Sequence, residues 1–297
     1  TIEIMMAALP MEKLCDGLYK PLLFLLFGDS ITQQGFLQAG WGSLLSSDYW
    51  SKCDVINRGF SGYNSRAGLI LLPHILAYLP TFPRLVTIFW GANDAALPSE
   101  EQHVPVDEYE QNLVKTVDII RSAKPESRDV DIIIIGPPPV GMAGIHGMSQ
   151  AGHKRQNSVT GEYASAACRA AAAAGVHFID LWSSMQKAKP KSSAERTDGW
   201  ECFLSDGIHF SKEGNAFLHD ALMKLIRESI PSLDPEEIWK IEGFPFPHWS
   251  KASLLSASSL WQQHTPNTHA HSSTSTASRH TSHARGTLKW SLPARVG

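Results

Sequence analysis

The sequence predicts an α/β fold, a three-layer sandwich in which helices cover both faces of a parallel sheet. Three observations support this prediction. Short apolar runs alternate with longer segments of helical periodicity from Leu22 to Ser229. The helical segments are long enough to connect parallel strands by right-handed crossovers. Several strand runs are apolar at every position, which is typical of strands that are covered on both faces.

The first elements are justified by apolar runs and their boundaries. PLLFLLF at 21–27 lies between a proline and a glycine and is too short to cross a bilayer, so we expect a buried strand. Apolar residues at helical spacing predict a helix over 41–50, and DVIN at 54–57 predicts a short strand. A Leu/Ile-rich helix over 66–79 stops before a proline, and LVTIFW at 85–90 is the third strand.

The later elements continue the alternation. We expect a helix over 107–123 and then a central strand at 130–135, which contains four consecutive isoleucines. An alanine-rich helix over 160–174 and the strand VHFIDL at 176–181 follow. The last long helix is expected over 212–229.

Composition limits the classes of function. The 297 residues are 43% hydrophobic and 19% charged, as in an ordinary globular protein. With a net charge of -3, the sequence lacks the excess of positive charge that is typical of proteins that bind nucleic acid or associate stably with an anionic membrane. The four cysteines have no CxxC spacing, so neither a zinc site nor a disulfide framework is indicated. The sequence does not indicate an oligomeric state.

The domain organisation follows from shifts in composition. We expect an N-terminal extension at 1–20, one globular domain at 21–250, and a tail at 251–297 that is rich in Ser, Thr and His and is predicted to be disordered. Acidic residues precede PLLFLLF and no small-residue cleavage site follows it, so we expect no export signal and a cytoplasmic location.

Polar groups follow the predicted strands in small-residue turns. The turns are Gly28-Asp29-Ser30, GFSGYN at 59–64 and GAND at 91–94, and a fourth turn, DGIH at 206–209, precedes the last helix. Parallel strands place their carboxyl ends at one edge of the sheet, where ligands bind in open α/β folds. We therefore expect these four turns to lie together. Asp29 and Asp94 are expected to hydrogen-bond the turn backbone.

This set of residue types suits acyl transfer, which needs a nucleophile, a base, a group that orients the base, and donors for the developing oxyanion. We assign Ser30 as nucleophile, His209 as base and Asp206 as the orienting carboxylate. The backbone N–H groups of Ser30 and Gly62 and the side-chain amide of Asn93 are the candidate oxyanion donors. Taken singly, Ser30 also fits a helix N-cap and Asp-x-x-His a capping or surface pair.

The four turns resemble the blocks of the GDSL esterases, also called SGNH hydrolases. FGDSIT, NRGFSGYNSR, GANDA and SDGIHFSKEGN match the serine, glycine, asparagine and histidine blocks, and the similarity runs from about residue 22 to 249. Within the family the chain looks most like the isoamyl acetate-hydrolysing esterase group, particularly its plant members. Ala67-Gly68 stands where that group leads us to expect a tryptophan.

The resemblance implies a flavodoxin-like three-layer fold and no metal or cofactor. It implies the same roles for Ser30, Gly62, Asn93, Asp206 and His209. The expected activity is hydrolysis of short-chain acyl or acetyl esters, small-molecule substrates, through an acyl-serine intermediate. Two alternatives stay open: an acetylesterase or acyltransferase acting on a polysaccharide or secondary metabolite, and a non-catalytic flavodoxin-like binding module.

Two further features bear on a substrate pocket. The glycine-rich loop at 140–152 follows a strand on the same sheet edge, so we expect it to form a wall of the pocket. Trp41 and Trp90 fit either the pocket lining or the core, and large buried aromatics favour the core.

Overall fold

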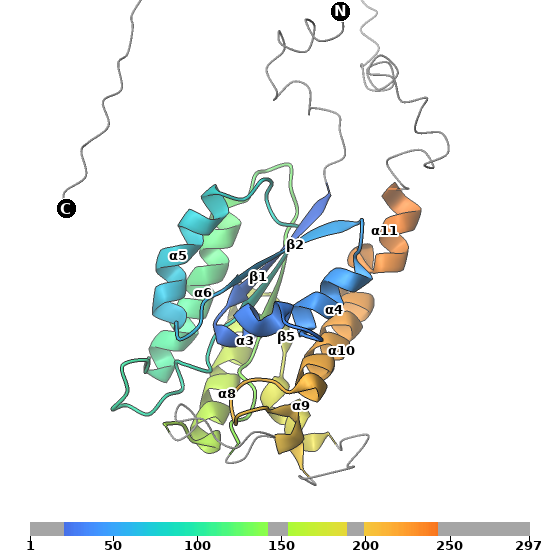
Figure 1. The fold of residues 1–297 in the computed structure, drawn as a ribbon. Coiled ribbons are helices and arrows are strands. Elements are labelled where there is room, and N and C mark those ends of the chain that lie inside the picture. The colour runs from blue at the N-terminus through green and yellow to red at the C-terminus, as the bar shows by residue number, and fades with distance from the viewer. Residues whose placement is uncertain (1–20, 142–153, 189–198, 243–297) are drawn as a thin grey trace, which may run out of the picture. The chain divides into compact units, whose positions relative to one another are not determined.

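A computed structural model of the chain describes residues 21–141, 154–188 and 199–242 (Figure 1). The predicted N-terminal extension at 1–20, most of the loop at 140–152 and the tail at 251–297 lie outside the described residues. The predicted domain boundaries therefore stay predictions.

The described part of the chain contains one parallel sheet of five strands. Its order is β2-β1-β3-β4-β5, and every neighbouring pair is parallel. The strands are β1 (Leu22–Gly28), β2 (Cys53–Gly59), β3 (Leu85–Phe89), β4 (Asp131–Ile135) and β5 (His177–Ile179). This is the flavodoxin-like order of doubly wound sheets, so the predicted fold class is confirmed.

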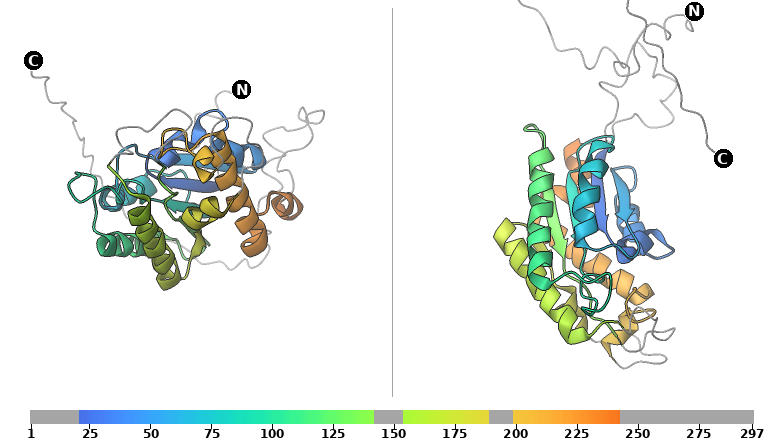
Figure 2. Two further views of the ribbon diagram at one scale, coloured as in Figure 1. Left: turned by 90° about the horizontal axis from the view of Figure 1, so that it is seen from below. Right: turned by 90° about the vertical axis from the view of Figure 1, so that its left-hand side faces the viewer.

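Helices cover both faces of this sheet (Figures 1 and 2). Helices α5, α6 and α8 pack in sequence on one face, and α4 contacts α10 on the other. The helices are α3 (Ser30–Gln33), α4 (Trp41–Asp48), α5 (Ser65–Ala77), α6 (Val106–Ala123), α8 (Asn157–Ala174), α9 (Leu181–Lys187), α10 (Lys212–Ser229) and α11 (Pro235–Glu242), with 3-10 turns η1 (Gln34–Phe36), η2 (Trp200–Phe203) and η3 (Pro231–Leu233). Among these described helices, none combines the length and apolar character that a membrane span requires.

The apolar strands build two hydrophobic cores, one on each face of the sheet. Along β1, Phe24 and Leu26 join the core beneath α4 and α10, while Leu23, Leu25 and Phe27 join the core beneath α5, α6 and α8. The isoleucines of β4 divide between the same two cores. Successive side chains of a strand point to opposite faces, so a strand with apolar residues at every position can supply both cores.

Some element boundaries differ from the sequence prediction. β2 extends to Gly59, because it pairs with β1 along the whole of Leu22–Gly28. β5 is only three residues long, since Asp180 already caps α9 by accepting a hydrogen bond from the Ser183 N–H. The prediction that the strand continues through Leu181 is wrong, and α9 and α11 were not predicted.

Three predicted turns lie at the carboxyl edge of the sheet, as expected. Gly28 at the end of β1 is level with Gly59 of β2 and Phe89 of β3. A Cβ on Gly28 would lie 2.3 Å from the carbonyl oxygen of Phe89, so only glycine fits where β1 turns beside β3. The residues that follow these strands therefore start from neighbouring points.

Candidate active site

Ser30 is the first residue of α3, directly after β1. The N-cap of this helix is Asp29, whose Oδ1 accepts a hydrogen bond of 2.9 Å from the Ile31 N–H. The alternative in which Ser30 is itself the cap is therefore wrong. Because Asp29 performs the capping, the Ser30 hydroxyl is left to make another interaction. The Ser30 residue is 5% exposed, at the carboxyl edge of the sheet.

His209 joins Ser30 to Asp206. His209 Nε2 lies 2.8 Å from Ser30 Oγ, and His209 Nδ1 lies 2.8 Å from Asp206 Oδ2. An ionised carboxylate only accepts hydrogen bonds, so Nδ1 carries the proton that is donated to Asp206. In a neutral imidazole Nε2 is then an acceptor, and it faces the Ser30 hydroxyl. The structure thus brings the three predicted residues into one hydrogen-bonded chain.

Asp206 is held as an anion. Burial, the largest single influence, raises the pKa of its carboxyl, but hydrogen bonds from the His209 ring and from the backbone N–H groups of His209 and Ile208 outweigh it. Together they lower the pKa of Asp206 from 3.8 to about 2. An anion at this place fixes both the tautomer and the orientation of the imidazole.

Asn93 and the turn that contains Gly62 are connected. Asn93 Nδ2 donates a hydrogen bond of 2.7 Å to the Tyr63 carbonyl, one residue after Gly62. Gly62 has φ +81°, and a Cβ there would meet only the side chain of Gln102, at 3.6 Å. The left-handed backbone conformation therefore requires glycine at this position. Space for a side chain is not the limiting factor.

Two buried carboxyls brace these turns. Asp94 accepts hydrogen bonds of 3.0 and 3.3 Å from the Ser65 N–H, and Asp29 accepts from the Ile31 N–H, so the expectation that both hold turn backbone is confirmed. Burial raises the pKa of Asp29 to about 7 and that of Asp94 to about 6, because a dry environment penalises the charged form.

Two polar residues beside Asn93 were not predicted from the sequence. Arg155 precedes α8 and is 6% exposed, and its Nη2 donates to Asn93 Oδ1 at 2.8 Å and to Gln102 Oε1 at 3.0 Å. Gln102 lies between β3 and α6. Neither residue belongs to a motif or a periodic pattern, so the sequence held no signal for their contact.

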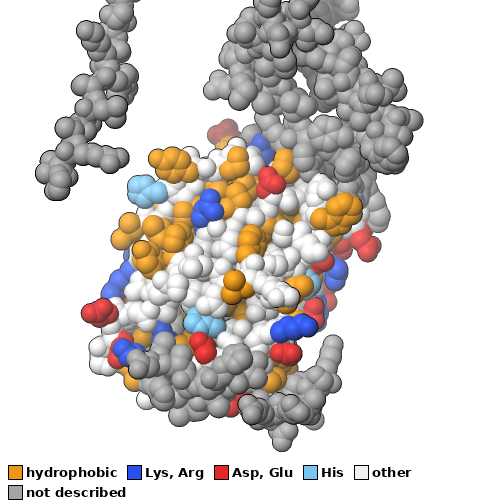
Figure 3. Space-filling model, viewed as in Figure 1, with side chains coloured by type: hydrophobic (Ala, Val, Ile, Leu, Met, Phe, Trp, Pro, Cys, Tyr) orange, Lys and Arg blue, Asp and Glu red, His pale blue; other side chains and the backbone are white. Residues whose placement is uncertain are grey.

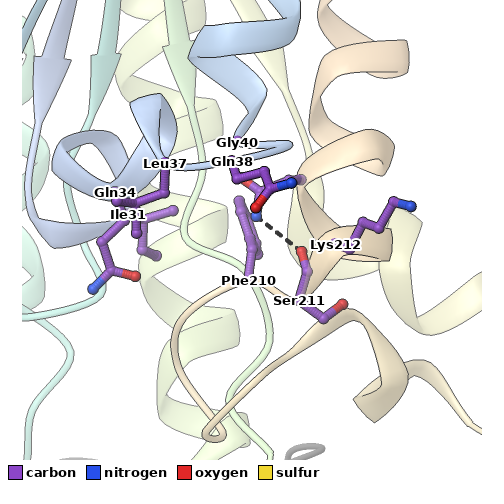
Figure 4. A pocket seen from close by; sticks show the side chains of 9 residues that line it. Ile31, Gln34, Leu37, Gln38, Gly40, Phe210, Ser211 and Lys212 are labelled. Carbon is purple, nitrogen blue, oxygen red and sulfur yellow. Dashed lines mark hydrogen bonds between the residues drawn. The ribbon is translucent and has the colours of Figure 1, made fainter.

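A pocket of about 150 Å³ is lined by residues of α3, of the loop before α4 and of the start of α10, and neither Ser30 nor His209 lines it (Figure 4). Ile31 and Phe210, which directly follow the two residues in sequence, both line it. Figure 4 shows residues of α3, η1 and the following loop facing residues at the start of α10. Trp41 and Trp90 are 0% and 1% exposed, so the expectation that they belong to the core is confirmed.

One face of the molecule has a mixed surface. On the face shown in Figure 3, hydrophobic side chains form separate small groups among polar ones, with charges of both signs between them. Isolated exposed hydrophobic side chains are normal on a protein surface. In the described part of the chain, no group of three or more His, Cys, Asp or Glu side chains is placed to hold a metal ion.

A histidine-bonded serine at the carboxyl edge of a parallel sheet defines the class of the protein as a serine hydrolase. Comparison with known proteins identifies the family. The model of the GDSL-like lipase/acylhydrolase family matches residues 26–217. The chain belongs to this family, and the resemblance found from the sequence motifs is confirmed.

Named relatives are esterases. An isoamyl acetate-hydrolyzing esterase 1 homolog of Mus musculus is 45% identical over an alignment of 217 residues, and the match covers 70% of this chain and 83% of the relative. A GDSL esterase/lipase of Arabidopsis thaliana is 40% identical over an alignment of 237 residues, and the match covers 76% of this chain and 91% of the relative. The chain is therefore an enzyme, an esterase or acylhydrolase, and the non-catalytic binding module is ruled out.

Solved structures share the fold. A lipase/acylhydrolase from Enterococcus faecalis is 28% identical, with a TM-score of 0.53 over 69% of this chain and 95% of the other. An acetyl xylan esterase has a TM-score of 0.55 over 69% of this chain and 100% of the other, at 21% identity. The second likeness shows the fold alone.

Proposed function

We propose that the chain hydrolyses carboxylic esters through an acyl-serine intermediate, with Ser30 as nucleophile, His209 as general base and Asp206 as the group that orients His209. The observation that carries this proposal is the unbroken chain of hydrogen bonds from Asp206 through His209 to Ser30, 2.8 Å at each side-chain link. Nucleophile, base and orienting group within hydrogen-bond reach are the signature of an activated serine.

In the first half-reaction, Ser30 Oγ attacks the carbonyl carbon of the ester while its proton passes to His209 Nε2. The carbonyl electron pair moves to the oxygen and forms an oxyanion. The intermediate collapses, the bond to the alkoxy group breaks, and His209 returns the proton so that an alcohol leaves. Water then repeats these steps on the acyl-serine, which releases the carboxylic acid and restores Ser30. Asp206 stays ionised throughout and stabilises the imidazolium.

The backbone N–H groups of Ser30 and Gly62 and the Nδ2 group of Asn93 are proposed to donate to the oxyanion. Asn93 is 5% exposed, and a donor in such a dry place stabilises developing charge more than it would in water. Loss of one such donor typically costs about 3 to 4 kcal/mol in the transition state.

The proposed substrates are esters with short acyl chains. The mouse, human, bovine and rat relatives are named for isoamyl acetate, a small ester. The pocket lined by Ile31 and Phe210, the residues that follow Ser30 and His209, has about 150 Å³, whereas sites for drug-sized ligands have about 300 Å³ or more. A cavity of about 150 Å³ accepts a molecule as large as benzene, so an acetyl or butyryl group fits.

The test is hydrolysis of p-nitrophenyl acetate, butyrate and octanoate by the full chain and by Ser30→Ala and His209→Ala. Each substitution should lower kcat by about a thousandfold or more, because the three residues act as a unit. His219→Ala is the matched control, since His219 also bonds an aspartate, Asp48, at 2.8 Å. A fluorophosphonate should label the parent and not Ser30→Ala. Activity retained by Ser30→Ala would refute the assignment, and preference for octanoate would refute the short-chain proposal.

A further inference from the structure

Two of the three proposed oxyanion donors, the Asn93 amide and the Gly62 N–H, share a support that the triad does not use. Arg155 lies just before α8, far in sequence from both donors, and its guanidinium is buried among them. Its Nε donates to the Ala92 carbonyl, the residue before Asn93. Gln102 is half-buried in the loop before α6 and accepts from the same guanidinium.

The Asn93 amide is held at both ends. Arginine only donates hydrogen bonds, so the group that faces Arg155 Nη2 at 2.8 Å must be the amide oxygen, Oδ1. The amide nitrogen then points to the Tyr63 carbonyl at 2.7 Å. An NH₂ group has two donor hydrogens, and only one is used in this bond. The second is the one proposed to donate to the oxyanion, and a rotation of the amide by 180° would break both existing bonds.

The turn that carries the Gly62 N–H is held by the same unit, through the peptide group that follows Gly62. Gln102 Nε2 donates to the Gly62 carbonyl at 2.9 Å, while its Oε1 accepts from Arg155 at 3.0 Å. The main chain of Gln102 is fixed in turn, because Asn64 Nδ2 donates to its carbonyl at 3.0 Å. One guanidinium therefore connects to Asn93 directly and to the Gly62 turn through Gln102.

The charge of Arg155 acts in the direction that favours the oxyanion. A hydrogen bond from a cation to Oδ1 withdraws electron density from the amide, which strengthens Nδ2–H as a donor. Burial opposes this charge, while the nearby carboxyls Asp29, Glu100 and Asp94 favour it. A guanidinium keeps its proton in proteins, so the positive charge persists behind the amide.

We propose that Arg155 and Gln102 are positioning residues that hold the Asn93 amide and the turn carrying the Gly62 N–H in the geometry in which both N–H groups donate to the oxyanion. This inference rests on the proposed esterase function. It assigns to Arg155 an effect on the transition state, which a merely structural arginine would not have.

The test is a double-mutant cycle on p-nitrophenyl butyrate with Asn93→Ala, Arg155→Met and the two changes combined. Arg155→Met alone should lower kcat by about 10-fold to 100-fold, with KM changed by less than about threefold, because a badly placed donor loses part of the effect of a whole donor. In the Asn93→Ala background the same change should lower kcat by a clearly smaller factor, since its direct target is gone and only the link to the Gly62 turn through Gln102 remains.

Further variants separate positioning from folding. Arg155→Lys keeps a cation but cannot reach Asn93 and Gln102 together, so its kcat should lie between those of the parent and Arg155→Met. Gln102→Leu, at a half-buried position, should lower kcat through the Gly62 turn without loss of the fold, and it tests the inference by itself if Arg155→Met does not fold. Arg169→Met is the matched control, because Arg169 lies on α8 and pairs only at the surface with Glu110.

The outcomes distinguish the inference from the proposed function. Equal fold-losses for Arg155→Met with and without Asn93 would overturn the inference alone, since they would show a general structural effect. Unchanged kcat in both Arg155→Met and Gln102→Leu would do the same. An inert parent chain, or one that is unaffected by Ser30→Ala, would overturn the proposed function and the inference with it.

Discussion

Replacement of Asp29 by asparagine should change how the stability of the protein depends on pH. The Asp29 residue is 1% exposed, and Oδ2 has no hydrogen-bond partner among the described residues. Burial is the main cause that raises the pKa of Asp29 from 3.8 to about 7. The Ile31 N–H, His209 and Arg155 act against this increase, and Asp94 adds to it.

The sign follows from proton binding in the two states. Between about pH 4 and pH 7 the folded protein keeps the Asp29 proton that the unfolded chain loses, so stability falls as pH rises through this window. A change from 3.8 to about 7 corresponds to about 4 kcal/mol at 1.36 kcal/mol for each pH unit. Asparagine has the shape of the protonated carboxyl and does not titrate, so it avoids this loss.

The assay is urea unfolding of the parent and Asp29→Asn at pH 5 and pH 8, with the exposed Asp118→Asn as control. From pH 5 to pH 8 the free energy of unfolding of Asp29→Asn should rise by about 3 kcal/mol relative to the parent, with similar m-values. Asp94 titrates in both proteins, so most of its contribution cancels, and what is left is the coupling between the two carboxyls. If the difference in the free energy of unfolding between the two proteins is the same at pH 5 and at pH 8, the reasoning is refuted.

Three further substitutions have defined expectations. Gly68→Ala in α5 should lower the free energy of unfolding, measured by urea unfolding, by about 1 kcal/mol. The new Cβ would lie 2.9 Å from the ring of Trp90, and this overpacking outweighs the higher helix propensity of alanine. A stabilised variant would contradict this expectation. Gly62→Ala should lower kcat by about tenfold or more. A φ of +81° costs a residue with a Cβ about 1 to 2 kcal/mol, so the turn should shift. An unchanged kcat would exclude a role for this turn in catalysis. Leu37→Trp should lower kcat/KM for butyrate more than for acetate, because Leu37 lines the pocket. Ile70→Trp, at an exposed helix position, should leave kcat/KM for both esters unchanged. Equal losses on both esters would contradict the assignment of this pocket to the acyl chain.

Much of the fold could be predicted because the signals are local. The run LLFLL in β1 and the isoleucines of β4 are apolar at every position, so the need for cover on both faces is visible in the sequence itself. The glycines that end the strands mark the edge where the proposed catalytic groups meet. Asp206 and His209 are three residues apart, so their contact also follows from local spacing.

The contacts that were missed depend on distant parts of the chain. Arg155 and Asn93 are 62 residues apart in sequence, and neither neighbourhood predicts that a buried cation faces the amide. The length of β5 depends on pairing with Ile133–Ile135 of β4, which its own residues do not specify. The start of α9 did have a local signal, the capping residue Asp180, but the apolar run VHFIDL favoured a longer strand.

The separation of Ser30 from His209 has a consequence for folding. The two residues are 179 positions apart and belong to opposite ends of the described chain, so their 2.8 Å contact requires the central sheet and the packing of α10 against α4. Contacts between such distant positions form slowly, because loop closure must precede them. The recovery of ester hydrolysis during refolding therefore reports the last stage of assembly. This activity should begin to recover after the helical circular dichroism signal has recovered.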